Sequence, residues 1–175
     1  NDASFALTSS FPTMLLTGLS IFDADPDAFN NILRLAEHAD ATLQILSSQG
    51  LSSKVPSSAF VVGSGSIPFA TSESTLKVME VTAGKIPALW DSTLGFRNCP
   101  NGTISNGAAI YILRSDEYHA TEYEADSVEE LCIQLAEATT MTNGEEANFL
   151  TKSIGSSAWD SFLCVMPAQL TSVVW

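Results

Sequence analysis

The start of a helix is the strongest local signal in this 175-residue chain. In the segment Asp23-Ala24-Asp25-Pro26-Asp27, Asp25 suits an N-cap, Pro26 suits the first helical position and Asp27 suits the positive end of the helix dipole. Beyond it, apolar residues recur at helical spacing and form one stripe, which contains Phe29, Ile32, Leu33, Ala36, Leu43 and Leu46. The pattern predicts a helix that runs to about Ser48.

Apolar segments on both sides of this helix predict strands, at 13–22, 59–62, 75–82, 108–113, 162–166 and 170–175. A capping box of Ser127 and Glu130 predicts a second helix that ends at Asn143-Gly144, and the segment 85–97 is expected to be irregular. This order of elements favours an α+β fold with a mostly antiparallel sheet and two main helices on one face; a ferredoxin-like core with additions is one such arrangement. No linker or repeat divides the chain, so we expect a single domain, 1–175.

The charge balance excludes some partners and favours others. Asp and Glu outnumber Lys and Arg by 20 to 7, and we therefore expect no nucleic acid as a partner, since phosphate backbones require a basic patch. No apolar run reaches the roughly 18 residues of a membrane span. Only 15% of the residues are charged. A sparsely charged polar surface is easily dehydrated, which favours contacts with other protein surfaces.

Both ends of the chain are unusually apolar. The residues concerned are Phe5, Leu7, Phe11 and Leu15 near the start, and Val173, Val174 and Trp175 at the end. Burying a terminal tryptophan is worth about 2–3 kcal/mol, so we expect these segments to be docked. Whether they dock as strands of their own sheet or on a neighbouring copy is left open by the sequence.

Sparse charge and apolar ends lead to a first functional hypothesis. It is a non-enzymatic structural subunit that self-assembles with copies of itself, either a virion component or an extracellular filament or surface protein. Because the chain begins at Asn1 without a methionine, prior processing or export is favoured, and we expect an extracellular or virion location.

The alternative hypothesis is an exported enzyme or a small-ligand-binding protein. Its pocket would be lined by Trp90, Phe96 and Arg97, with His119 as the titrating group. His119 with Glu122 could form an acid/base pair or begin a metal site. It stands, however, in an acidic stretch that also contains Glu124 and Asp126, and such a charge run is more typical of a solvated loop.

One metal site is considered. Asp23, Asp25 and Asp27 form a D-x-D-x-D run that could bind calcium through carboxylates on a flexible loop. A calcium-binding EF-hand loop requires Gly and Glu where Ala28 and Arg34 stand, so the helix cap is the preferred interpretation, and no other cofactor is expected.

Other motifs carry weaker signals. Gly63-Ser64-Gly65-Ser66 could form a backbone nest for an anion, but it lacks the Gly-Lys-Ser/Thr ending of a phosphate loop, and a tight turn is preferred. Ser74 and Lys77 match the Ser-x-x-Lys pattern of acyl-transfer enzymes, yet on a strand they would point to opposite faces. The Asn101-Gly102-Thr103 sequon is equally well explained as a turn. The three cysteines, Cys99, Cys132 and Cys164, match no zinc motif and are expected to be buried thiols.

Overall fold

A parallel sheet forms the centre of the protein. The structure is a computed structural model that describes residues 7–49, 54–65, 67–98, 104, 107–114, 124–126, 129, 139–142 and 153–175. Four strands lie in the order β2-β1-β3-β4, and they are β1 (Ala59–Gly63), β2 (Ala88–Asp91), β3 (Ala109–Leu113) and β4 (Thr139–Thr142). Every neighbouring pair is parallel, so the prediction of a mostly antiparallel, ferredoxin-like sheet is wrong.

The two central strands explain the parallel arrangement. Every residue of β1 and of β3 is buried, which confirms the strands predicted at 59–62 and 108–113. Strands that are covered on both faces consist of continuous apolar runs, and such runs are typical of parallel sheets with helices on each side. An antiparallel sheet with one solvated face would instead alternate apolar and polar residues.

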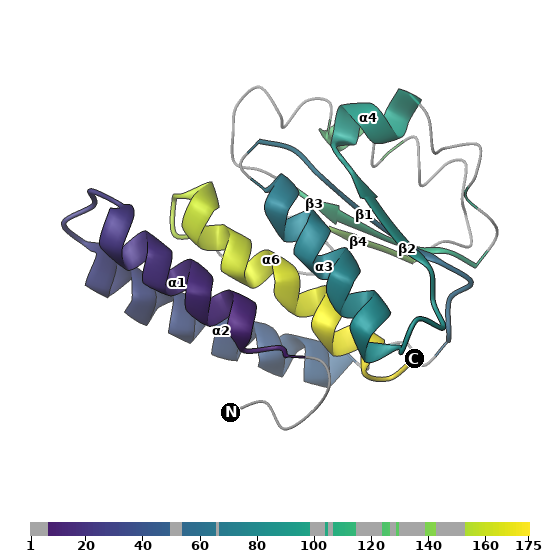
Figure 1. Ribbon diagram of the computed structural model, residues 1–175, viewed down its shortest axis with the longest axis horizontal. Helices are drawn as coiled ribbons and strands as arrows, with labels where there is room; N and C mark the ends of the chain where they lie inside the picture. The colour runs from purple at the N-terminus through teal and green to yellow at the C-terminus, as the bar shows by residue number, and fades with distance from the viewer. Residues whose placement is uncertain are drawn as a thin grey trace.

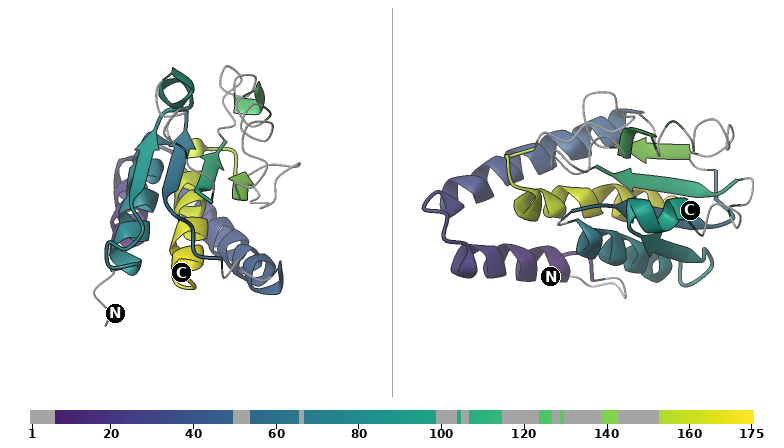
Figure 2. Two further views of the ribbon diagram at one scale, coloured as in Figure 1. Left: turned by 90° about the vertical axis from the view of Figure 1, so that its right-hand side faces the viewer. Right: turned by 90° about the horizontal axis from the view of Figure 1, so that it is seen from above.

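Helices cover both faces of the sheet, as Figure 1 and Figure 2 show. On one side lie α1 (Ser10–Phe22), α2 (Ala28–Gln49), α3 (Pro68–Val81) and α6 (Ser157–Ser172). Of these, α3 and α6 are the inner pair, while α1 and α2 pack against α6 as an outer layer. The short helix α4 (Thr93–Asn98) lies on the other side of the sheet.

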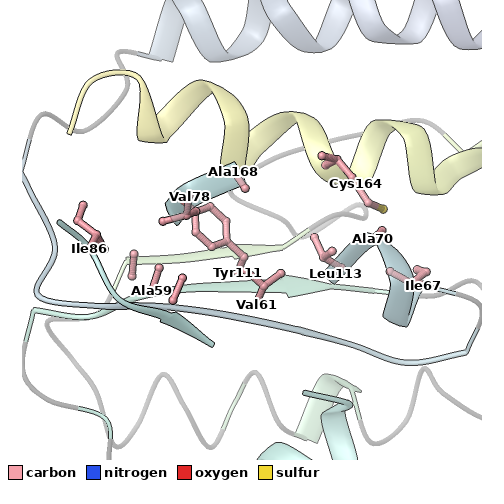
Figure 3. Packing of buried hydrophobic residues seen from close by; sticks show 13 residues of the cluster. Ala59, Val61, Ile67, Ala70, Val78, Ile86, Tyr111, Leu113, Cys164 and Ala168 are labelled. Atoms are coloured by element: carbon pink, nitrogen blue, oxygen red, sulfur yellow. The ribbon is translucent and has the colours of Figure 1, made fainter. Parts of the chain in front are cut away.

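The main core lies between the sheet and the two inner helices (Figure 3). Val61 and Tyr111 enter it from the strands, Val78 from α3, and Cys164 from α6 as a buried thiol. A second apolar cluster covers the opposite face of the sheet and contains Phe60, Val62, Phe96, Ala108, Ile110 and Ile112. Both faces of β1 and β3 are therefore filled, as the alternation of side chains along a strand requires.

Four segments that were predicted as strands are wholly or partly helical. The segments 13–22 and 75–82 lie in or overlap α1 and α3, 162–166 lies in α6, and the first half of 170–175 belongs to α6. Short apolar runs do not distinguish a helix from a strand by periodicity alone. Proline provided a missed signal, because Pro12 and Pro68 stand in first helical turns, where a missing N–H costs nothing.

Two other predictions need revision, and one is confirmed. The segment 85–97, expected to be irregular, contains β2 and most of α4. Residues 139–142, placed in the second helix, form β4, while the rest of that helix lies almost wholly outside the described residues. The helix predicted up to Ser48 is confirmed as α2, although it begins at Ala28, two residues after Pro26.

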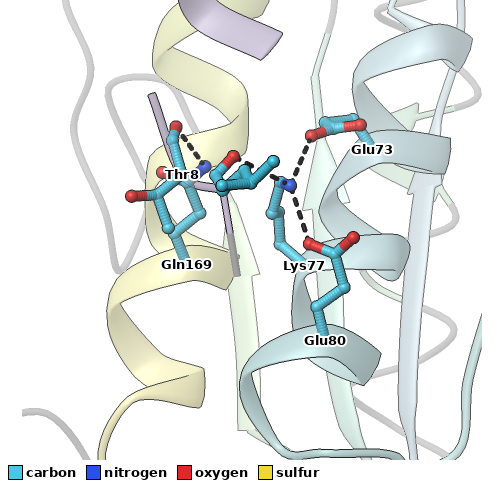
Figure 4. A network of polar contacts seen from close by, with 6 residues as sticks. Thr8, Glu73, Lys77, Glu80 and Gln169 are labelled. Carbon is cyan, nitrogen blue, oxygen red and sulfur yellow. Dashed lines mark hydrogen bonds and ion pairs between the residues drawn. The ribbon is translucent and has the colours of Figure 1, made fainter. Parts of the chain in front are cut away.

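Polar contacts fasten the segment before α1 to the inner helices (Figure 4). Lys77 of α3 donates a hydrogen bond from Nζ to the Leu7 carbonyl oxygen at 3.2 Å. The same ammonium contacts Glu80 at 2.8 Å and Glu73 at 3.2 Å. Gln169 of α6 donates to the Thr8 carbonyl oxygen at 3.3 Å.

The apolar ends are docked only in part. Trp175 packs against the main core, with its ring 6.2 Å from that of Tyr111, and Phe11 packs at the rim of the same core. Leu15 is half-buried, whereas Leu7, Val173 and Val174 are exposed. Phe5 lies outside the described residues. The terminal tryptophan thus contacts its own fold, and it does so beyond the end of a helix, not as part of a strand.

Candidate functional site

The carboxyl ends of the strands form the candidate site. In open parallel sheets, ligands bind beyond these ends, at the position where the strand order reverses. Here the chain passes from β1 outward to β2 and then returns to the other side of β1 to form β3. The reversal therefore lies between β1 and β3, and the loops that follow β1, β2 and β3 are the segments to consider.

The turn after β1 is tightly packed. A side chain at Gly63 would place its Cβ 2.9 Å from Thr71 Cγ2 and 3.1 Å from the Leu113 carbonyl oxygen, so glycine permits the end of β1 to approach both α3 and β3. Gly65 has a φ of +67°, a left-handed conformation that favours glycine. Between them, Ser64 donates a hydrogen bond from Oγ to Thr93 Oγ1 at 2.7 Å.

The loop after β2 is organised around a carboxylate. Asp91 Oδ1 accepts a hydrogen bond from the Ser92 backbone N–H at 2.7 Å, and Ser92 Oγ in turn accepts one from the Gly95 N–H at 3.0 Å, which caps α4. A Cβ at Gly95 would lie 2.2 Å from Asp91 Oδ1, so only glycine leaves room for the carboxylate. Thr93, the partner of Ser64, is buried at the first position of this helix.

A cation follows β3 at the same edge. Gly63 and Leu113 are register partners, so Ser64 and Arg114 are the first residues beyond the ends of their strands. Arg114 is half-buried and has polar contacts of its own. From β3 through β1 to β2, the edge thus carries a guanidinium group, a pair of hydroxyl groups and the carboxylate of Asp91.

A second carboxylate lies on the single helical turn 124–126. Glu124 is completely buried, whereas the neighbouring Asp126 is exposed. In Figure 2 this turn lies at the same end of the sheet as α4, beyond the carboxyl ends of the strands. The interpretation of the acidic stretch as a solvated loop is therefore wrong for Glu124. A carboxylate removed from water is costly, and such groups are common at functional sites.

The residues predicted to line a ligand pocket do not come together. Phe96 is buried in the second apolar cluster, 5.8 Å from the ring of Phe60. Trp90 is paired with Val61 and belongs to the other face of the sheet, where it is 49% exposed. Arg97 is exposed on α4, and His119 lies outside the described residues.

The three aspartates of the possible calcium loop are engaged separately. Asp23 Oδ2 accepts a hydrogen bond from Trp159 Nε1 at 2.7 Å, and Asp25 and Asp27 accept hydrogen bonds from asparagine side chains of α2. In the part of the chain that the structure describes, no three Asp, Glu, His or Cys side chains are placed to hold a metal ion. The same residues contain no helix with the length and apolar character needed to cross a membrane.

Ser74 and Lys77 of the Ser-x-x-Lys motif do lie on a helix, contrary to expectation, but Lys77 is engaged in ion pairs with Glu73 and Glu80. Burial disfavours the charged form of Lys77, but hydrogen bonds and charge interactions with Glu80 and Glu73 outweigh burial, and the pKa of Lys77 is raised above 10.5. A general base must be able to lose its proton near neutral pH. Lys77 therefore serves to hold the chain together and is unsuited to activate Ser74.

Comparison with known proteins shows that the chain is similar to enzymes that are named for sugar phosphates. No family model matches the chain. It is 30% identical over 175 residues to the D-galactosamine-6-phosphate deaminase AgaS of Shewanella sp. (strain ANA-3), in an alignment that covers 99% of this chain and 44% of that protein. Its structure is similar to that of a tagatose-6-phosphate ketose/aldose isomerase from Escherichia coli, with a TM-score of 0.82 and 26% identity, over 97% of this chain and 50% of the other.

A third comparison supports the fold alone. Glucosamine-6-phosphate deaminase from Thermotoga maritima superposes with a TM-score of 0.73 at 19% identity, over 98% of this chain and 52% of that one. The fold is thus the Rossmann-like fold of phosphosugar isomerases (the SIS fold). The chain spans about half the length of these proteins, or somewhat less.

These similarities overturn the first functional hypothesis. The relatives are enzymes of sugar-phosphate metabolism, so the prediction of a self-assembling structural subunit of a virion or filament is wrong. The prediction gave too much weight to the apolar ends. The most apolar of them, Trp175, packs on the core of its own fold and does not require a neighbouring copy to cover it.

Proposed function

We propose that the carboxyl edge of the sheet binds the phosphate group of a hexose 6-phosphate, and that the chain contributes to isomerisation or deamination of that sugar. The observation that supports this function is the hydroxyl pair formed by Ser64, on the turn after β1, and Thr93, at the start of α4. That turn stands where the strand order reverses, in a fold shared with sugar-phosphate enzymes.

The residues at this turn suit a phosphate. Backbone N–H groups of a glycine-containing turn and the positive end of the α3 dipole both favour an anion. Hydroxyl groups can donate to phosphate oxygens, and Arg114 offers a planar fork of donors one strand away. Local donors are needed here, because a net charge of −13 repels a dianion from the protein as a whole.

The two reactions named for the relatives share one chemical step. In the deamination of galactosamine 6-phosphate, a proton moves from C2 to C1, and one water molecule then replaces the amine at C2, which releases ammonia and leaves tagatose 6-phosphate. An aldose–ketose isomerisation moves a proton between the same two carbons. Both reactions therefore require a group that takes a proton from one carbon and returns it to the next. Glu124, buried at the same end of the sheet, is the described carboxylate that we assign to this role.

Binding measurements test the phosphate site. Isothermal titration calorimetry with tagatose 6-phosphate and galactosamine 6-phosphate is expected to show binding of both, whereas free tagatose and free galactosamine should not bind. Inorganic phosphate should compete with the phosphorylated sugars. Equal binding of sugars with and without phosphate, or no binding of either, would contradict the proposal.

The acid/base role has a separate test. Glu124→Gln keeps the size of the side chain but cannot accept a proton at neutral pH. We expect it to abolish exchange of a C1 proton of tagatose 6-phosphate with deuterated solvent, measured by NMR, while affinity for the sugar phosphate is retained. Asp126→Asn, at an exposed position of the same turn, is the matched control. Unchanged proton exchange in Glu124→Gln would remove this residue from the mechanism.

A further inference from the structure

We infer that Asp91 binds the ammonium group of an amino-sugar phosphate and thereby makes the site selective for amino sugars over neutral ones. The inference rests on the proposed function, and it narrows the substrate class. It assigns a role to the one acidic side chain that stands at the end of β2, beside the turn to which phosphate is assigned.

The position of Asp91 follows from the strand register. Asp91 pairs with Val62 of β1, one residue before Gly63 and two before Ser64. Neighbouring strands lie about 4.8 Å apart and a strand rises about 3.3 Å per residue, so the backbone at Asp91 stands roughly 8 Å from that at Ser64. Arg114 follows the strand on the opposite side of β1. A ligand that reaches from the turn toward β2 would meet a negative group there.

The carboxylate is held in place but is not fully satisfied. Its Oδ1 accepts hydrogen bonds from the Ser92 N–H at 2.7 Å and from Ser92 Oγ at 3.3 Å. Gly95 has no side chain and so leaves room for it against α4. Asp91 Oδ2 accepts no hydrogen bond, and the carboxylate forms no ion pair, with any residue that the structure describes. Asp91 is half-buried, so a ligand can still reach it.

Electrostatics explains why a neutral sugar phosphate would be disfavoured. A carboxylate this close to a bound phosphate repels it, and the repulsion is stronger at a partly buried site than in bulk water. An ammonium group on the sugar cancels the repulsion and can donate a charge-assisted hydrogen bond to Oδ2. A hydroxyl group at the same carbon provides neither effect to the same degree. Hydrogen bonds to charged groups correspond to a preference of about 10- to 100-fold.

The test compares ligands that differ at C2 alone. The wild-type chain is expected to bind galactosamine 6-phosphate about 10- to 100-fold more tightly than galactose 6-phosphate. N-acetylgalactosamine 6-phosphate, whose nitrogen is uncharged, should show no such advantage. Asp91→Asn keeps an oxygen for the Ser92 N–H and removes the charge. It should abolish the preference by weakening binding of the amino sugar and strengthening binding of galactose 6-phosphate.

The outcomes separate this inference from the proposed function. If the wild-type chain binds no sugar phosphate, the phosphate site itself is refuted. If it binds galactosamine 6-phosphate and galactose 6-phosphate equally, only the role of Asp91 is refuted. Equal weakening of both ligands in Asp91→Asn would overturn the inference and assign Asp91 to holding α4 alone. The wild-type comparison decides the question even if the variant fails to fold.

Discussion

Trp159 Nε1 donates a hydrogen bond to Asp23 Oδ2 at 2.7 Å and so joins segments 136 residues apart. The indole is completely buried on α6, and the carboxylate stands in the connection between α1 and α2. The acidic run that could be interpreted as a calcium loop thus contributes its first carboxylate to the packing of the outer helices against α6.

Asp23→Ala is expected to lower the free energy of unfolding by about 1–3 kcal/mol, because it leaves a buried N–H without an acceptor. Urea denaturation measures the change. Asp40→Ala is the control, since the carboxylate of Asp40 is exposed and, among the residues that the structure describes, accepts a hydrogen bond from Gln44 alone. Calcium should leave the melting temperature of the wild-type chain unchanged. A calcium-dependent rise that Asp23→Ala abolishes would restore the metal hypothesis.

Lys77 predicts a loss of stability at alkaline pH. Burial opposes its charge, but contacts with Glu80 and Glu73 prevail and raise the pKa of Lys77 above 10.5. A raised folded pKa means that the stabilisation is fully present below pH 10.5 and disappears as the pH rises through the folded pKa. In thermal melts between pH 8 and 12, Lys77→Met should therefore flatten the alkaline decline. Lys85→Met, at an exposed position, should not.

Tyr111 contributes to the same decline for a different reason. Burial raises the pKa of its phenol well above 10.0, and the opposing effect of the Thr171 hydrogen bond is smaller. Thr171 Oγ1 donates to the Pro167 carbonyl oxygen at 2.8 Å, so the tyrosine hydroxyl acts as the donor to Thr171.

Tyr111→Phe should cost about 1 kcal/mol at neutral pH, from one lost hydrogen bond. Above pH 10.0 it should be less sensitive to alkali than the wild-type chain, because only the unfolded wild-type tyrosine loses its proton readily. Thr171→Val should lower the free energy of unfolding by more than Tyr111→Phe does, since it leaves the buried hydroxyl group of Tyr111 without an acceptor. Equal alkaline curves for wild type and Tyr111→Phe would contradict the prediction.

The Ser64–Thr93 pair predicts coupled effects on ligand binding. Ser64→Ala should weaken binding of sugar phosphates by about threefold to tenfold, the value of one hydrogen bond. Thr93→Val should weaken binding by a similar factor. The decrease in affinity of the double variant should be smaller than the product of the two single decreases, because the two hydroxyl groups share one hydrogen bond. Calorimetry with tagatose 6-phosphate measures all three. Ser20→Ala on the exposed face of α1 is the matched control. An equal loss of affinity in Ser20→Ala would show that Ser64 and Thr93 have no specific role in ligand binding.

The sequence predicted the elements whose residues are uniform in character. The helix α2 was identified from its start and from the helical spacing of its apolar residues, although Phe29, Leu33 and Leu43 of the predicted stripe are exposed. The apolar runs at β1 and β3 could be identified because burial and secondary structure agree there. The other long helices lack that agreement. No charged residue occurs in α1, and α3 buries Thr71, Ser74, Thr75 and Lys77 along with its apolar residues. Because α3 was not recognised as the helix between β1 and β2, the βαβ unit that these elements form was missed, and parallel pairing was not inferred.

The site was partly visible in the sequence. The glycine-serine motif at 63–66 was noted as a possible anion nest, but it was set aside because it lacks the Gly-Lys-Ser/Thr ending of a phosphate loop and because Pro68 was not recognised as the start of a helix. The partner of Ser64 is 29 residues away, and only the parallel register brings Thr93 to it. Asp91 was overlooked because a lone aspartate in an apparently irregular segment carries no signal. Its meaning depends on its place at the end of β2.

The contacts of Lys77 and Trp159 have a joint consequence for motion. Their hydrogen bonds hold α1 at both ends, through Leu7 before the helix and Asp23 after it, although none of the residues of α1 is fully buried. A helix held in this way should detach as one unit when either of these two hydrogen bonds breaks. Its amide protons would then exchange with solvent as a group, and well before those of α6 beneath it.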